Sequence, residues 1–260
     1  MKKIIILLLM IGIPLALYLP ITLSFTSEEF WPISSLVPQT PDKTNEPASS
    51  ATHETEQAIS TNGSPEVMLD DFFTSCTLDE KYGDNLQSLI KLDPQYIDYT
   101  DLRYLEVLHI GFDGEIHKGE LIVHQAIAEE VLEIFKELYY ISFPIEKMKA
   151  IHHYDNSDES SMEDNNTSAF NFRMITNGSI PSNHAYGLAI DINPKINPYV
   201  YAHKVLPSNG TEYANRNQDI PGMITADSEV CKIFKKLGWT WGGDWDQPKD
   251  YQHFEKDIEF

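Results

Sequence analysis

The sequence predicts an α+β domain with a small antiparallel sheet flanked by helices. Residues 105–112 are rich in β-forming apolar side chains and end at the turn pair Asp113-Gly114, so residues 120–123 are expected to return as the next strand. Over residues 126–139 the apolar side chains recur at helical spacing, which predicts the main helix.

Further elements are expected on both sides of this core. Mixed helical character is expected at residues 70–91, strands at residues 147–154, 169–175, 239–241 and 251–255, and a second helix at residues 227–237. The polar residues 155–168 and the Pro/Asn-rich residues 193–198 are expected to be loops.

Composition limits the classes of function. The chain has 260 residues, 42% of them hydrophobic and 23% charged, which suits one globular domain or two small ones. A formal net charge of -21 argues against nucleic-acid binding and against docking of the folded part on anionic lipid. Two cysteines, Cys76 and Cys231, exclude a disulfide scaffold and a thiolate zinc site; they are either bonded or, as we favour, buried thiols. We expect a monomer.

The N-terminal part predicts export from the cytoplasm. Lys2-Lys3 precede an apolar run, so residues 1–25 are expected to be a membrane anchor or a removed signal peptide. Residues 26–66 are rich in Ser, Thr, Pro and Glu without an apolar period, which predicts a disordered linker. The folded domain is expected over residues 67–260, outside the membrane, either anchored or secreted.

A metal site is suggested by His184 and Asp191, which stand seven positions apart with Gly187 between them. Catalytic zinc sites take three protein ligands from His and Asp/Glu and leave one position open. Gly187 permits a sharp bend before the strand that carries Asp191, and the small Ala189 beside that carboxylate leaves room for an ion. His253 is the natural third ligand. Taken singly, His184 is more readily a surface or hydrogen-bonded loop histidine, and Asp191 and His253 are each as readily hydrogen-bonded structural residues.

Asp250 and Arg173 are the candidate helpers. Asp250 lies three residues before His253, so we expect it in the turn that enters the last strand, where it can move a proton between water and a leaving amine. It can equally be a turn-capping aspartate, and Asp244 and Asp246 compete for the same role. Arg173 can hold a carbonyl oxygen as charge develops on it, or form a surface ion pair.

The remaining histidines are less suited to metal binding. His152 and His153 are adjacent, so in the strand expected at residues 147–154 their rings would diverge and could not bind one ion. The acidic loop at residues 155–168 lacks the glycine that a helix-loop-helix calcium site has at its sixth position, which favours a solvated loop.

These residues together resemble the M15 family of bacterial cell-wall metallopeptidases. The matching marks are Ser-x-His-x-x-Gly-x-Ala-x-Asp at residues 182–191, Asp-x-x-His at residues 250–253, and the upstream Arg173. The Asn-Pro segment at residues 193–199 and the Trp/Gly segment at residues 239–245 are also similar to the D-alanyl-D-alanine carboxypeptidase-like branch. The resemblance implies the α+β zinc DD-peptidase (hedgehog-like) fold.

The resemblance covers residues 105–255 and implies roles by position. The implied residues are the zinc ligands His184, Asp191 and His253, the general base Asp250, the oxyanion-supporting Arg173, the substrate contacts Tyr186 and Trp245, and Ser182 as a substrate contact or a support for the ligands. Phe172 stands where many relatives have cysteine, which should alter packing and not chemistry. Aspartate at position 250, where the dipeptidase branch has glutamate, favours the endopeptidase-like side.

We therefore expect a zinc-dependent peptidase that hydrolyses peptide bonds in bacterial peptidoglycan stem peptides, of the D-Ala-D-Ala carboxypeptidase or the L-Ala-D-Glu endopeptidase type. The alternative is a non-catalytic cell-wall-binding module that keeps the fold. A structural or metal-buffering zinc domain is disfavoured, because three ligands leave an open coordination position.

Overall fold

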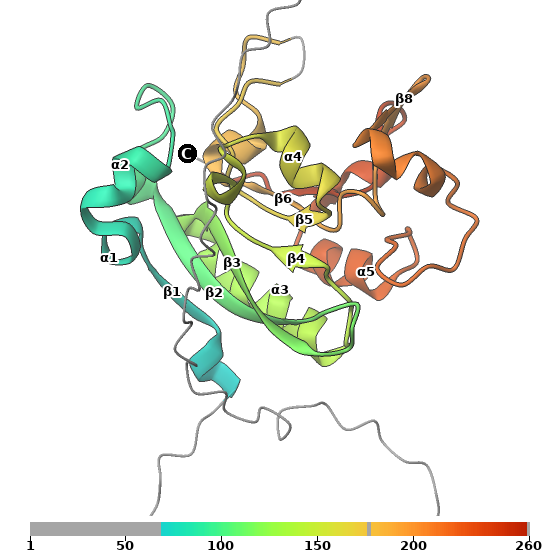
Figure 1. The fold of residues 1–260 in the computed structure, drawn as a ribbon, viewed down its shortest axis with the longest axis horizontal. Coiled ribbons are helices and arrows are strands. Elements are labelled where there is room, and N and C mark those ends of the chain that lie inside the picture. The colour runs from blue at the N-terminus through green and yellow to red at the C-terminus, as the bar shows by residue number, and fades with distance from the viewer. Residues whose placement is uncertain (1–68, 176–177, 259–260) are drawn as a thin grey trace, which may run out of the picture. The chain divides into compact units, whose positions relative to one another are not determined.

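In the part of the chain that the structure describes, most strands belong to three separate three-stranded antiparallel sheets, with helices packed around them (Figure 1). The structure, a computed structural model, describes residues 69–175 and 178–258. Helices and short sheets are mixed throughout these residues, so the predicted α+β class is confirmed. One two-stranded sheet, β4 (Lys147–Met148) with β5 (Asn166–Thr167), is parallel.

The N-terminal sheet has the order β1 (Thr74–Thr77), β2 (Leu102–Ile110), β3 (Ile116–His124). The predicted hairpin is β2–β3; β2 begins and ends earlier than its predicted range, whereas β3 extends beyond its predicted range at both ends. Gly114 occupies its turn with a φ of +79°, a left-handed conformation that favours glycine. Strand β1 lies within residues 70–91, where only helical structure was expected, and it pairs with β2.

Both predicted helices are present. α3 (Ala128–Tyr140) packs on β2 and turns an apolar face to the core, with Val131, Ile134 and Phe135 fully buried. α5 (Glu229–Lys236) packs against α3. Its first turn is capped by Ser228, whose hydroxyl oxygen accepts a hydrogen bond from the amide of Cys231.

The third sheet has the order β6 (Ala189–Asp191), β11 (His253–Glu255), β9 (Thr240–Trp241). The ring of Phe254 in β11 is fully buried and stacks on Phe234 of α5, with 4.0 Å between the ring centroids. Burying a side chain of this size contributes about 2–3 kcal/mol relative to leaving it exposed. Helix α5 thus fixes the strand on which His253 lies.

The hairpin β7 (Tyr199–Tyr201) and β8 (Lys204–Leu206) pairs with β10 (Lys249–Asp250) to form the second sheet. Residues 193–198 are loop, as predicted. The hairpin that follows them was not predicted.

The predicted strand at residues 147–154 is wrong beyond its first two positions. Only β4 is strand, and after it the chain forms a 3-10 turn, η6 (Ile151–Tyr154). Residues 155–168, expected as a loop, contain the helix α4 (Asp158–Glu163). The hydroxyl oxygen of Ser157 accepts from the amide of Ser160, and acidic residues fill the first turn, so capping and dipole interactions stabilise this polar segment as a helix.

The predicted strand at residues 169–175 is also wrong. This segment belongs to no sheet: within it only Met174 makes an isolated bridge, to Pro181, and Ser168 just before it pairs with Asp191.

The hairpin β2–β3 is buried on both faces, between two apolar clusters. Leu105 and Val107 belong to the larger cluster with α3, α5 and the third sheet, whereas Tyr104 and Ile122 belong to a smaller one beneath the first helices. The remaining short elements are η2 (Leu69–Phe72), α1 (Leu78–Tyr82), η3 (Gly83–Asn85), α2 (Leu86–Leu89), η4 (Tyr99–Asp101), η5 (Gln125–Ile127), η7 (Asn183–Tyr186), η8 (Ser208–Ala214) and η9 (Gly242–Asp244).

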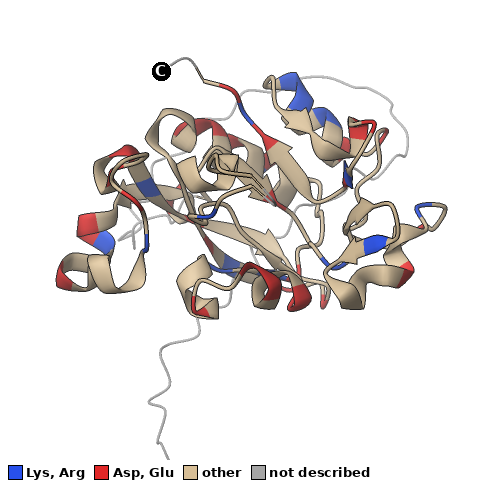
Figure 2. Cartoon of the chain, turned by 90° about the horizontal axis from the view of Figure 1, so that it is seen from above, with Lys and Arg blue, Asp and Glu red and all other residues tan. Residues whose placement is uncertain are grey.

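Acidic and basic residues are interspersed over the domain and occur together on some elements, such as α1 and α5 (Figure 2). Cys76 is half-buried, Cys231 is buried, and both are free thiols. The predicted anchor, residues 1–25, and the predicted linker, residues 26–66, lie outside the described residues. Across residues 69–175 and 178–258, no helix has the length and apolarity needed to cross a membrane.

Candidate metal centre

The turn η7 carries His184 into the interior, where only 2% of the residue is exposed. The hydroxyl oxygen of Ser182 accepts from the amide of His184 at 3.4 Å and so caps this turn. Gly187 ends it with a φ of +67°. Ser182 therefore positions the His184 backbone, and its predicted contact with substrate stays a prediction.

Gly187 is required here for space as well as for conformation. Its carbonyl oxygen accepts from the amide of His124 at the end of β3, at 2.9 Å. A Cβ atom at position 187 would lie 2.6 Å from that same amide nitrogen, which is closer than such atoms approach. The glycine thus lets the turn that carries His184 pack directly against the N-terminal sheet.

Strand pairing places Asp191 and His253 opposite each other, in β6 and β11. His253 Nδ1 lies 3.1 Å from Asp191 Oδ1 and 3.1 Å from His184 Nε2, and His184 Nε2 lies 3.2 Å from Asp191 Oδ2. All three residues are buried. Two imidazoles and one carboxylate, drawn from segments far apart in the sequence, thus present ligand atoms within 4.8 Å of one another.

The second nitrogen of each imidazole has its own acceptor. His184 Nδ1 lies 2.6 Å from the carbonyl oxygen of Ala169, so it donates and leaves Nε2 with a free lone pair. His253 Nε2 lies 3.1 Å from Glu255 Oε2, which also accepts from the side-chain amide of Asn183 at 2.7 Å. Outer hydrogen bonds of this kind fix the ring orientation and tautomer of histidines that bind metals.

Glu255 is a residue that the sequence analysis missed. The signal for it was present, because residues two apart on a strand share a face and Glu255 follows His253 by two. Its hydrogen bond to His253 lowers the pKa of the Glu255 carboxyl, so the carboxylate stays ionised beside the ring.

The buried charges compensate one another. Burial alone would raise the pKa of Asp191, but the neighbouring His184 and His253 lower it below its ordinary value. Burial alone would lower the pKa of His253, but hydrogen bonds to Asp191 and Glu255 raise it to about 10. The cluster is therefore an environment that holds a positive charge among carboxylates, either as a proton or as a cation.

Asp250 lies at the end of β10, where it pairs with Tyr199, and not in a turn as predicted. A bend of two residues separates it from β11. Gly242 makes room for it, because a Cβ at that position would lie 2.6 Å from the Asp250 carbonyl oxygen and 2.8 Å from its Cβ. The absence of a side chain at Gly242 thus lets η9 pack closely against Asp250.

One oxygen of the Asp250 carboxyl, Oδ1, is buried and makes no hydrogen bond to the described residues. Burial raises the pKa of Asp250 to about 7, and the charge of Asp191 also raises it, against the lowering effect of His253. The competing carboxylates are on the surface: Asp244 pairs with Lys235 at 2.6 Å, and Asp246 is exposed.

Arg173 lies in the extended segment before η7, and its Nε is 3.2 Å from Asp158 Oδ2 of α4. The two groups are at ion-pair distance, although Nε has no hydrogen-bond partner within the described part of the chain. The positive charge of Arg173 acts on Asp250, which places the guanidinium in electrostatic range of the cluster.

The two predicted aromatic contacts differ in position. The Trp245 ring is half-buried with its centroid 5.4 Å from that of His253, so it forms a wall beside the cluster. Tyr186 is half-buried and packs against both apolar clusters of the core. A role in packing is therefore evident for Tyr186.

The donor set fits a zinc ion. Two neutral imidazoles and a carboxylate are common zinc ligands, and the described residues supply no fourth protein ligand to this cluster. Both rings are already oriented by acceptors on their far nitrogens, which is the arrangement that metal-binding histidines require.

Comparison with known proteins matches residues 176–256 to the family model described as D-alanyl-D-alanine carboxypeptidase. The matched segment contains His184, Asp191, Asp250 and His253, and it excludes Arg173. No curated protein and no solved structure matches the chain. Over residues 176–256 the chain is thus similar to D-alanyl-D-alanine carboxypeptidases, and this similarity supports a peptidase.

Proposed function

We propose that the chain is a zinc-dependent peptidase that hydrolyses peptide bonds in bacterial peptidoglycan stem peptides. The observation that carries the proposal is the buried convergence of His184 Nε2, His253 Nδ1 and the Asp191 carboxylate, with each ring oriented from its far side. The match to a carboxypeptidase family model over the same residues supports it.

His184, Asp191 and His253 would hold the zinc ion. When bound, zinc polarises a carbonyl group and makes water acidic enough to act as a nucleophile near neutral pH. Ala169 and Glu255 keep the two imidazoles in the orientation and tautomer that this binding needs.

Asp250 is the proton carrier in this proposal. Its Oδ1 is buried beside the cluster and is free to accept a proton from the attacking water and to return it to the leaving amine. A pKa raised by burial brings the carboxyl closer to the working pH of a general base than an exposed aspartate would be.

Arg173 and Trp245 are assigned to substrate. The Arg173 guanidinium would support negative charge on the scissile carbonyl oxygen or on a substrate carboxylate, with Asp158 holding it in place. Trp245 would form a wall of the binding site next to His253.

We propose that the bond cut is either the terminal D-Ala-D-Ala bond or the L-Ala-D-Glu bond, and that the enzyme acts as a monomer outside the cytoplasm. The apolar run at residues 4–25 supports this location, because Lys2 and Lys3 precede it. The chain would then be anchored by this segment or secreted.

The test is digestion of purified muropeptides by the full chain and by the variant Asp250→Asn, followed by mass spectrometry. We expect cleavage by the unchanged protein and a loss of about 10²–10⁴-fold in turnover for the variant, because a general acid-base contributes by that factor. Fragment masses identify the bond, since loss of a terminal D-Ala differs from a cut after L-Ala.

The matched control is Asp246→Asn, which removes an exposed carboxylate from the same segment and should leave turnover unchanged. If the unchanged protein, loaded with zinc, cleaves no stem peptide, the peptidase proposal is wrong. A non-catalytic wall-binding module is then the better description.

A further inference from the structure

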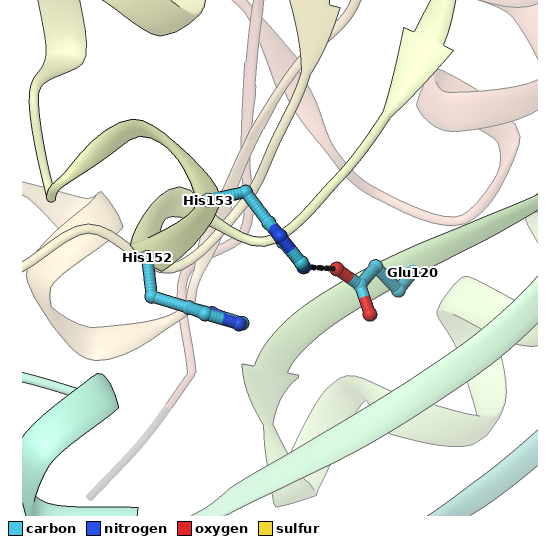
Figure 3. Close-up of side chains that lie close together, drawn as sticks. All are labelled: Glu120, His152 and His153. Carbon is cyan, nitrogen blue, oxygen red and sulfur yellow. Dashed lines mark ion pairs between the residues drawn. The ribbon is translucent and has the colours of Figure 1, made fainter. Parts of the chain in front are cut away.

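A second group of side chains that could hold a metal ion shares no residue with the first. It comprises Glu120 on β3 and the adjacent His152 and His153 on the turn η6. One ligand atom from each of the three lies within 4.8 Å of the others. In Figure 3 both imidazole rings point from the turn to the side on which Glu120 lies.

The adjacent histidines converge because the backbone is not a strand. The sequence analysis expected these two rings to diverge, and that expectation is wrong. In a 3-10 turn neighbouring side chains are about 120° apart around the axis, less than the about 180° of a strand, and the ring centroids of His152 and His153 are 4.2 Å apart, with a 35° angle between the planes. The carboxylate of Glu120 faces both.

Glu120 is held in place by its surroundings. Tyr104 donates its hydroxyl proton to Oε2 at 2.9 Å, and the amide of Ala150 donates to Oε1 at 3.2 Å. His153 Nε2 lies 2.5 Å from the same Oε1. Only 17% of the Glu120 side chain is exposed, so the carboxylate is oriented as metal-binding carboxylates are, by hydrogen bonds from behind.

Two polar atoms beside this group are buried without a partner. They are His152 Nδ1 and the hydroxyl oxygen of Tyr82, both of which lack hydrogen bonds within the described residues. The Tyr82 ring packs edge-on against His152, with the centroids 5.3 Å apart. A buried polar atom left unpaired costs about 1–3 kcal/mol, so its presence calls for an explanation such as a ligand.

We propose that Glu120, His152 and His153 bind a second metal ion, a divalent transition metal of the zinc class. Two imidazoles and one carboxylate suit zinc, nickel or copper better than magnesium or calcium, which prefer oxygen ligands. The metal ion would take the place of the direct contact between His153 Nε2 and Glu120 Oε1. The site shares no residue with the first cluster and does not depend on the proposed function.

The second site joins two parts of the domain. Glu120 belongs to the N-terminal sheet, and η6 leads directly into α4. Helix α4 carries Asp158, which pairs with Arg173 and accepts from the side-chain amide of Asn171 at 3.1 Å. A metal ion bound at this site therefore connects the sheet to the helix that holds Arg173.

The experiment measures zinc bound per chain in the full chain, purified, stripped with a chelator and titrated with Zn²⁺. The variants are Glu120→Gln and His153→Asn, each made in the unchanged protein and in an Asp191→Asn background that disables the first cluster. We expect each to bind about one zinc fewer than its parent and to lose the zinc-dependent rise in melting temperature that this site confers.

The matched control is His117→Asn. His117 is also on β3, its side chain is 44% exposed, and its Nε2 lies 2.9 Å from Asp113 Oδ2. Among the described residues, no third ligand atom completes a metal-binding group with these two side chains. This variant should bind as much zinc as its parent.

Equal zinc content in Glu120→Gln, His153→Asn and their parents would overturn the proposal. His153 is 46% exposed, so its replacement should leave the fold intact, and circular dichroism of the stripped protein checks this directly. If the first cluster binds no zinc, the comparison is still valid. Each variant is compared with its own parent, both in the unchanged protein and in the Asp191→Asn background.

Discussion

Glu255 shows how much of a metal site depends on a residue that does not touch the metal. Its carboxylate links the far nitrogen of His253 to the side chain of Asn183, and so fixes the ring that faces Asp191. Partners of this kind set the basicity and the orientation of a metal-binding imidazole.

We therefore expect Glu255→Gln to weaken zinc binding at the first site by about 10–100-fold. Glutamine is neutral and holds the imidazole less strongly, because the charge-assisted hydrogen bond is lost. Competition with a zinc chelator, measured in the Glu120→Gln background, reports on the first site alone. Asp257→Asn, an exposed carboxylate two residues further on, is the control and should bind zinc as its parent does. Equal affinities for both variants would contradict the role given to Glu255.

The sequence predicted the residues of the first cluster better than their surroundings. His184 and Asp191 were found by their spacing around Gly187, and His253 by the second motif, and the structure brings all three together. Asp250 was placed in a turn but lies in β10, because its pairing with Tyr199 depends on a hairpin that no local pattern revealed. The convergence of His152 and His153 was missed because it depends on the backbone type at η6.

At the scale of elements, the junction between η7 and β6 decides whether the site forms. Gly187→Ala must adopt a φ of +67° and must also accommodate a Cβ at 2.6 Å from the His124 amide. The left-handed conformation costs about 1–2 kcal/mol, and overpacking against backbone adds about 1–3 kcal/mol. We expect the free energy of unfolding in urea to fall by roughly 2–5 kcal/mol, with loss of zinc binding at the first site.

Gly114→Ala separates the two causes. Gly114 also has a positive φ, +79°, but a Cβ there would meet nothing within 4 Å. This variant should lose only about 1–2 kcal/mol and keep its zinc. If the two glycine variants are equally destabilised, the close approach to β3 does not matter.

Elements with a strong local signal were predicted, and elements set by tertiary contacts were not. The apolar period of α3 and the turn at Gly114 are local, and both are present. The helix α4 was missed because its residues are almost all polar, and its cap at Ser157 was read as part of a loop. The strand expected at residues 169–175 failed because this segment finds only single bridging partners.

At the scale of the whole molecule, two effects of acid oppose each other. The formal net charge of -21 means that lowering the pH reduces repulsion between carboxylates, which favours the folded state. Buried neutral histidines act in the opposite direction, because they must take up protons when the chain unfolds. His109 on β2 is such a residue, 4% exposed and facing His117.

Burial lowers the pKa of His109 to about 4, and the neighbouring His117 adds to this effect. An unfolded histidine has a pKa of about 6.5, so between pH 6.5 and 4 the unfolded chain binds a proton that the folded protein does not. The free energy of unfolding therefore decreases as the pH is lowered from 6.5 to 4, and His109 accounts for up to roughly 3 kcal/mol of this decrease. We expect urea denaturation between pH 7 and pH 4 to show a smaller loss for His109→Phe than for the unchanged protein.

The phenylalanine keeps an aromatic ring at the buried position but cannot bind a proton, so the difference in pH dependence isolates the titration of His109. His117→Gln is the control, because His117 is exposed; most of the pH dependence should remain, since burial of His109 is its main cause. Parallel stability curves for His109→Phe and the unchanged protein would mean that His109 is protonated without unfolding, and that acid sensitivity arises from other groups of the domain.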